Sequence, residues 1–99
     1  MKKCRITVLK TLLFEDLRDE YMAPDFGTCP VMKVGDVFTT GGLFGNSMPE
    51  CFCEYAWQAV QNMACTLAGG GRVFGEDFNI ACCNDGIRPL ILKLEAVDE

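Results

Sequence analysis

The feature that most constrains the fold is a turn signal between two apolar segments near the C-terminus. Asn84, Asp85 and Gly86 stand together there, and all three residue types tolerate the positive φ that a tight hairpin turn requires. Pro89 has no N–H to donate to a sheet, so a strand in this region either lies at an edge or begins just after it. We therefore expect a hairpin running from about residue 78 to residue 95.

The second strand of this hairpin has a clear period of two. Leu90, Leu92 and Leu94 face one way, and Ile91, Lys93 and Glu95 face the other. Such alternation is typical of a strand with one buried and one exposed face. The three leucines are thus predicted to lie in the core.

Two further strands are predicted upstream. In residues 4–10, Ile6 and Val8 alternate with polar positions, and β-branched residues at this period favour a strand. Residues 37–40 resemble a second strand that ends at a pair of glycines. Pairing of the first of these strands with the terminal hairpin would give a mainly antiparallel sheet of about four strands.

Two helices are expected from spacing near three and four residues. Phe14, Leu17 and Tyr21 predict a short helix near 14–22. A longer apolar stripe begins after Pro49, a residue suited to a first turn, and ends at the glycines of 69–71. This stripe predicts a long helix at about 49–68 that packs on the sheet, so the expected fold class is α+β.

Length and composition predict a single domain, 1–99, that associates with itself. The chain has 99 residues, of which 49% are hydrophobic. A domain this small has much surface for its volume, so part of its apolar surface is expected to stay uncovered. We expect a homo-oligomer in which the outer side of the long helix, or a sheet edge, contacts another subunit.

Charge and hydropathy exclude several partners. The net charge is −5 and the nine basic residues are scattered, so neither nucleic acid nor an anionic membrane surface is an expected partner. No run of 18 apolar residues is present, and Lys10 interrupts the only stretch that resembles a signal peptide. A cytoplasmic protein with reduced thiols is expected.

The cysteine content leaves a metal or redox role open. Seven cysteines and no histidine are present, which removes Cys-His nucleophile pairs and mixed Cys/His zinc sites. There is no C-x-x-C motif, the usual feature of zinc ribbons and ferredoxins. A four-thiolate site, for zinc or an iron–sulfur cluster, would need folding to gather Cys29, Cys53, Cys83 and one more cysteine. The commoner alternative is that Cys65 and at least one of Cys82 and Cys83 are small buried apolar groups.

Two other groups have both a structural and a functional interpretation. Cys53 and Trp57 are four residues apart, so on a helix they share one face, either in core packing or around a thiol in an aromatic-walled pocket. Asp85 and Arg88 are either a turn former with its ion pair or a small anion site made by turn N–H groups and the guanidinium. Arg88 could also activate a nearby thiol.

The chain resembles a family of small uncharacterised prokaryotic proteins of about 90–100 residues. The resemblance covers nearly the whole sequence and rests on a Cys-Pro loop at Cys29, a Phe-Cys-x-x-Ala-Trp segment at 52–57, and a Cys-Cys-x-Asp-Gly-Ile-Arg-Pro hairpin at 82–89. Members of that family often have proline where this chain has Asn84. The resemblance implies no activity, but it marks the shared positions Cys29, Cys53, Trp57, Cys83, Asp85 and Arg88.

The first functional hypothesis is a binding or accessory module whose ligand site is lined by those six residues, with a small molecule or an anion as ligand. The second is a thiol-dependent redox or metal-binding protein that uses the same cysteines. The third is a structural oligomerisation domain with inert thiols. The sequence identifies no cofactor and does not decide whether the protein is an enzyme.

Overall fold

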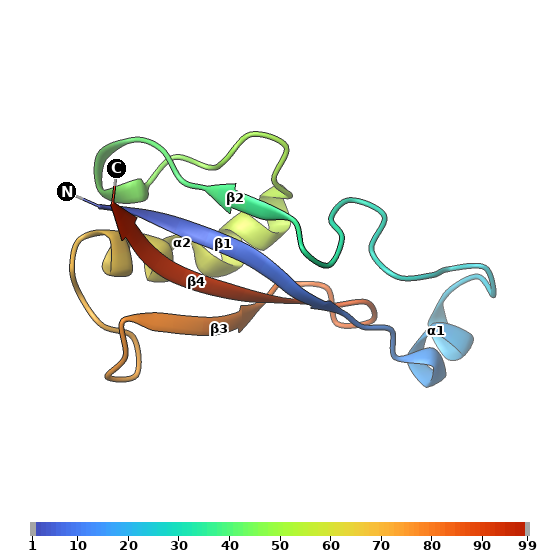
Figure 1. Cartoon of the computed structure of the whole chain (residues 1–99). Helices are drawn as coiled ribbons and strands as arrows, with labels where there is room; N and C mark the ends of the chain where they lie inside the picture. Colours follow the sequence, from blue (N-terminus) through green and yellow to red (C-terminus); the bar gives the residue numbers. More distant parts are fainter. Residues whose placement is uncertain (1, 99) are drawn as a thin grey trace.

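The final strand of the chain is the centre of the architecture. The computed structural model describes residues 2–98, in which one four-stranded sheet is accompanied by two helices (Figure 1). The elements in chain order are β1 (Lys2–Thr11), α1 (Glu15–Tyr21), β2 (Val37–Thr39), the 3₁₀ turn η1 (Leu43–Gly45), α2 (Glu54–Ala68), β3 (Phe78–Cys82) and β4 (Leu90–Asp98). The α+β class and the four-stranded antiparallel sheet were both predicted from the sequence.

The sheet has the order β2-β1-β4-β3, and every neighbouring pair is antiparallel. β1 and β4 pair over most of their length, from Lys2 opposite Asp98 to Thr11 opposite Leu90. The first strand therefore pairs with the terminal hairpin, as expected. The two short strands, β2 and β3, form the edges.

One face of the sheet supplies half of the hydrophobic core. Leu90, Leu92 and Leu94 of β4 are fully buried, and Ile6 and Val8 of β1 are buried beside them. Their burial confirms the faces predicted from the alternating pattern. The other half comes from a stripe on α2, which lies over this face of the sheet in Figure 1 and whose buried residues share the same cluster: Ala56, Trp57, Val60, Ala64, Leu67 and Ala68.

The longer helix begins later than predicted. α2 has 15 residues and starts at Glu54, not near residue 49. Cys51 has a φ of 62°, which no α-helix accommodates, and Cys53 is extended. This turn carries Phe52 into the core, where it is 6% exposed, so burial of one aromatic ring displaces the first helical turn. No helix within residues 2–98 is long and apolar enough to cross a membrane.

The connection between β3 and β4 is also longer than predicted. The two strands are separated by residues 83–89, so a seven-residue loop replaces a tight turn at 84–86. β4 begins directly after Pro89. Of the two arrangements expected for this proline, an edge strand or a strand that begins just after it, the structure has the second. The longer loop leaves room for side chains that a two-residue turn would have pointed into solvent.

The short helix α1 projects from one end of the molecule. It lies beyond the ends of β1 and β4, and the chain is elongated as a result, with extents of 46 × 27 × 20 Å (Figure 1). α1 contains no buried residue, and Phe14, Leu17 and Tyr21 remain 45%, 37% and 68% exposed. The helix predicted near 14–22 is therefore present, but its apolar side chains are not part of the hydrophobic core of residues 2–98.

The central strand generates the first testable prediction. Leu92 is fully buried between α2 and both neighbouring strands. Leu92→Ala removes three heavy atoms from this site, and we expect the free energy of unfolding to fall by about 2 to 5 kcal/mol. Urea unfolding under reducing conditions measures the change. Val37→Ala on the edge strand, where Val37 is 54% exposed, is the control and should cost less than about 0.5 kcal/mol.

Candidate functional site

A cavity of about 410 Å³ lies beside the start of α2. Three separate segments line it: the loop at 29–32, the first turn of α2, and the loop that joins β3 to β4. Its walls are largely apolar, with a few polar groups at one side. The lining residues are Cys29, Pro30, Val31, Met32, Cys53, Tyr55, Ala56, Cys83, Asn84, Asp85, Arg88 and Leu90.

Each wall is fixed by a buried anchor or a hydrogen bond. Met32 is fully buried and holds the first loop against the core, as Leu90 does for β4. Asn84 donates a hydrogen bond from Nδ2 to the carbonyl of Tyr55 over 3.0 Å, which ties the β3–β4 loop to α2. The cavity is therefore lined by segments that are held in place before any ligand binds.

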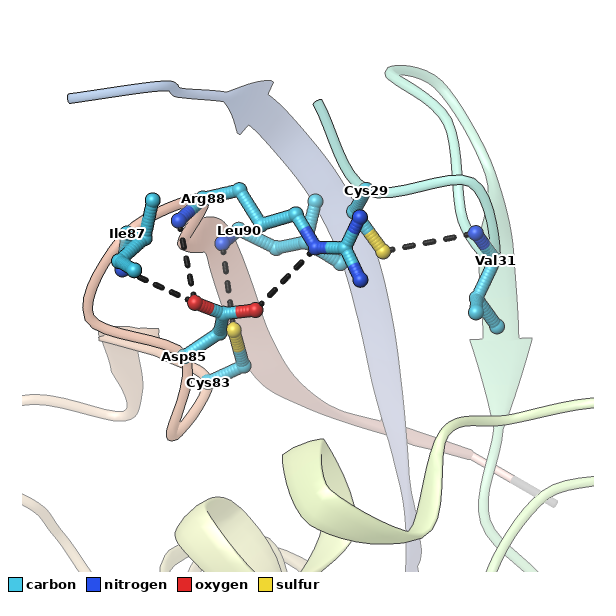
Figure 2. A network of polar contacts seen from close by, with 7 residues as sticks. All are labelled: Cys29, Val31, Cys83, Asp85, Ile87, Arg88 and Leu90. Carbon is cyan, nitrogen blue, oxygen red and sulfur yellow. Dashed lines mark hydrogen bonds and ion pairs between the residues drawn. The ribbon is translucent and has the colours of Figure 1, made fainter. Parts of the chain in front are cut away.

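Asp85 organises the β3–β4 loop. Its Oδ1 accepts hydrogen bonds from the N–H groups of Ile87 and Arg88, at 2.9 and 3.1 Å, and its Oδ2 accepts one from Arg88 Nε at 3.2 Å (Figure 2). A carboxylate that accepts donors from residues two and three positions later is the usual side-chain mimic of a turn. The same bonds hold the start of the Arg88 side chain in one orientation.

The protonation of Asp85 reflects these contacts. Partial burial raises the pKa of this carboxyl, but the N–H groups of Arg88 and Ile87 and the Arg88 guanidinium lower it by more, so the pKa lies below the ordinary value of 3.8. Asp85 is thus a carboxylate at neutral pH, and its charge is directed at groups of its own loop.

Arg88 presents an unused edge to the cavity. Its Nε is bound to Asp85, and its guanidinium lies over the ring of Phe26, 4.0 Å from the ring centroid. No hydrogen bond or ion pair of the described residues uses Nη1 or Nη2. Figure 2 shows the guanidinium between the Asp85 carboxylate and the sulfur of Cys29. Two parallel N–H donors on a fixed guanidinium match the geometry of a carboxylate or phosphate.

Three thiols share this cavity. The sulfur of Cys29 accepts a hydrogen bond from the N–H of Val31 at 3.4 Å, and that of Cys83 accepts one from the N–H of Leu90 at 3.3 Å (Figure 2). Cys53 precedes the first residue of α2 and lines the same space. Within residues 2–98, no group of three Cys, Asp or Glu side chains is placed so that it could hold a metal ion.

The structure therefore brings together five of the six residues singled out from the sequence, namely Cys29, Cys53, Cys83, Asp85 and Arg88. Trp57 does not line the cavity. Its ring is 9% exposed and meets Phe52 edge-on, with centroids 6.3 Å apart, so it belongs to the core. The expected helical face shared by Cys53 and Trp57 does not exist, because Cys53 lies outside the helix.

The remaining thiols differ from one another. Cys4 is fully buried, whereas Cys51 and Cys82 are exposed and Cys65 is half-buried. Cys65 was expected to be buried and is only half-buried. Cys82 is exposed whereas Cys83 is half-buried, as expected for neighbouring residues whose side chains point to opposite faces of a strand. Burial raises the pKa of the Cys4 thiol to about 11.

Sequence reasoning missed Tyr55, Met32 and Phe26. Tyr55 lies two residues after the predicted Cys53 and is 71% exposed, and no pattern in the sequence sets it apart from other surface residues. Met32 and Phe26 lie in a loop rich in proline and glycine where no period indicates which side chains turn inward. Only tertiary structure shows that Phe26 lies under the Arg88 guanidinium.

Comparison with models of known protein families, with curated proteins and with solved structures gives no match for this chain.

The Asp85 contacts generate a prediction about pH. Because its pKa is lower in the folded than in the unfolded chain, the ionised group stabilises the fold above its unfolded pKa, and this contribution is lost as pH falls through the folded pKa. Asp85→Asn should therefore be less stable than the parent at neutral pH, with the difference narrowing below about pH 4. Thermal melts across the acid range measure this difference; a gap independent of pH would contradict it.

Thiol accessibility gives a third prediction. Iodoacetamide at mildly alkaline pH should alkylate Cys51 and Cys82 first, because both are exposed, and Cys4 only on unfolding, because its thiol is buried and its pKa is raised. Peptide mass spectrometry after timed quenching measures each site. Early modification of Cys4 in the folded protein would contradict its burial in the core.

Proposed function

We propose that this chain is a cytoplasmic binding module for a small molecule that has an apolar body and one anionic group. The observation that carries this proposal is the unused Nη1 and Nη2 edge of Arg88 at the side of a largely apolar cavity. A ligand carboxylate would accept both donors, and the rest of the molecule would lie against the apolar side chains. Cavities with this combination are the usual form of small-molecule sites.

The apolar part of the site is built from residues on all three walls. Val31 and the rings of Pro30 and Tyr55 offer accessible apolar surface, and the buried side chains of Met32, Ala56 and Leu90 lie beneath it. Burial of a ligand there is favourable by about 25 cal/mol for each Å² of apolar surface removed from water. The apolar body of the ligand would therefore contribute most of the binding free energy, and the contact between its anionic group and Arg88 would fix its orientation.

Asp85 does not oppose an anion at this position. Both of its oxygens are engaged by donors of its own loop, two N–H groups and the Arg88 Nε. These contacts compensate its charge locally and turn the free edge of Arg88 away from it. The Phe26 ring under the guanidinium further restricts its movement, so little conformational entropy is lost on binding.

A panel of aliphatic and aromatic carboxylic acids, each paired with its neutral primary amide, tests the proposal. At about 100 times its Kd, a bound acid should stabilise the fold by about 2.7 kcal/mol and raise Tm by about 10 to 20 °C. The amides should bind less tightly, because they lack the charge that Arg88 recognises. Differential scanning fluorimetry measures the shift.

Arg88→Gln and Arg72→Gln are the matched variants for this panel. Arg72 is exposed, lies outside the cavity and donates from Nη1 to the carbonyl of Gly75 at 3.1 Å. We expect Arg88→Gln to lose the preference for acid over amide and Arg72→Gln to keep it. If acids stabilise both variants equally, Arg88 is not the residue that recognises the carboxylate. If no acid stabilises the parent protein, the proposed binding function is wrong.

The second candidate is a thiol-dependent redox role, which is favoured by the N–H groups aimed at the sulfurs of Cys29 and Cys83. A thiolate from either cysteine would attack a small disulfide, form a mixed disulfide and release the other half as a thiol. Mass spectrometry after exposure to oxidised glutathione tests it: modification confined to exposed Cys51 and Cys82 would leave only the binding role or a purely structural one.

A further inference from the structure

β3 leaves one edge of the sheet unpaired. It is the last strand in the order β2-β1-β4-β3, and Figure 1 shows no element beyond it. Among the described residues, its only strand partner is β4. An open edge is a row of free N–H and C=O groups, and proteins normally protect such rows with charge, proline or a covering element. The sequence Phe-Asn-Ile-Ala-Cys of β3 has neither a charge nor a proline.

The register shows which groups face outward. The N–H of Cys83 donates to the carbonyl of Leu90, directly opposite, so this pair is of the hydrogen-bonded kind. In an antiparallel ladder these pairs alternate, so Asn79 and Ala81 also bond to β4. The main-chain groups of Phe78, Ile80 and Cys82 therefore point to the free edge.

The side chains of the same three residues lie on the face of the sheet opposite α2. Phe78 and Ile80 are 39% and 49% exposed, and Cys82 is exposed as well, whereas Asn79 is buried on the α2 side. Asn79 Nδ2 contacts the sulfur of Met63 at 2.8 Å, which fixes β3 against the helix. The edge is thus rigid, apolar on its outer face and unpaired along its length.

We propose that this edge pairs with the same edge of a second copy, so that the chain forms a two-fold symmetric dimer with β3 antiparallel to β3 and Ile80 opposite Ile80. In this register Phe78 lies opposite Cys82 of the second copy, and all outward N–H and C=O groups of the three residues are paired. The pairing is self-complementary, as a two-fold interface requires. The two sheets become one continuous sheet with both copies of α2 on the same face.

Charge is compatible with this register. No charged residue lies within β3, and Asp77, which precedes it, falls opposite neutral Cys83 of the second copy. Like charges therefore do not face each other, although the chain as a whole has a net charge of −5. The apolar outer side chains of the two strands adjoin across the axis and remove each other from water.

Two substitutions at one position test the dimer. Ile80→Pro removes an N–H that points away from β4, so it should leave the monomer folded and abolish dimerisation. Ile80→Lys places two positive charges opposite each other on the axis and should do the same. Val37→Lys, an exposed apolar residue on the other edge strand, is the matched control and should stay dimeric. Light scattering across a dilution series under reducing conditions measures the mass, and circular dichroism checks the fold.

Hydrogen exchange on the unmodified chain gives an independent measurement. In the dimer, the amides of Phe78, Ile80 and Cys82 should be protected at high concentration and lose protection on dilution, whereas those of Asn79 and Ala81 stay protected throughout. A parent that has the mass of a monomer at every concentration, with fast exchange at the three outward amides, would overturn the proposal. A dimer that persists in Ile80→Pro would overturn the register.

Discussion

The structure depends on burial of the leucine face of β4. Leu90, Leu92 and Leu94 are covered by α2, and the strand that bears them is bonded on both sides. Each fully buried leucine contributes about 1.5 to 3 kcal/mol through removal from water. Because Pro89 sets where this strand begins, it also sets where the preceding loop must end. The position of Arg88, one residue earlier, is thus a consequence of the core as much as of the turn.

Much of this architecture follows from local sequence, because its periods are strong. Alternation in β1 and β4 reports faces correctly, since one side of each strand is buried and the other is not. The boundaries of the helices are predicted less accurately from local sequence. The stripe from Phe52 to Leu67 has helical spacing, yet Phe52 reaches the core from a turn in which Cys51 has a φ of 62°. Burial alone cannot distinguish a helical residue from one brought inward by a bend.

In the candidate site too, local contacts could be predicted from the sequence and tertiary contacts could not. Asp85 and Arg88 could be placed together because their bonds are local, spanning three residues. That Cys29 and Cys53 line the same cavity depends on tertiary contacts, which no local pattern in the sequence reports. Trp57 lies in the core and does not line the cavity, and Cys53, which was expected to share a helical face with it, precedes the helix. Phe26 had no signal at all, since a stacking contact across 62 residues leaves no period in the sequence.

The guanidinium of Arg88 is shared between two parts of the molecule. Its Nε contacts the β3–β4 loop, its face rests on Phe26, and the carbonyl of Phe26 accepts a hydrogen bond from Arg18 of α1 at 3.4 Å. The projecting arm is therefore linked to the wall of the cavity on both sides of α1: through Phe26, which follows the helix, and through Phe14, which precedes it and donates its N–H to the carbonyl of Ile87 at 2.8 Å. Because these contacts lie before and after α1, the helix cannot shift relative to the cavity unless the Phe14–Ile87 hydrogen bond or the Phe26–Arg88 contact breaks.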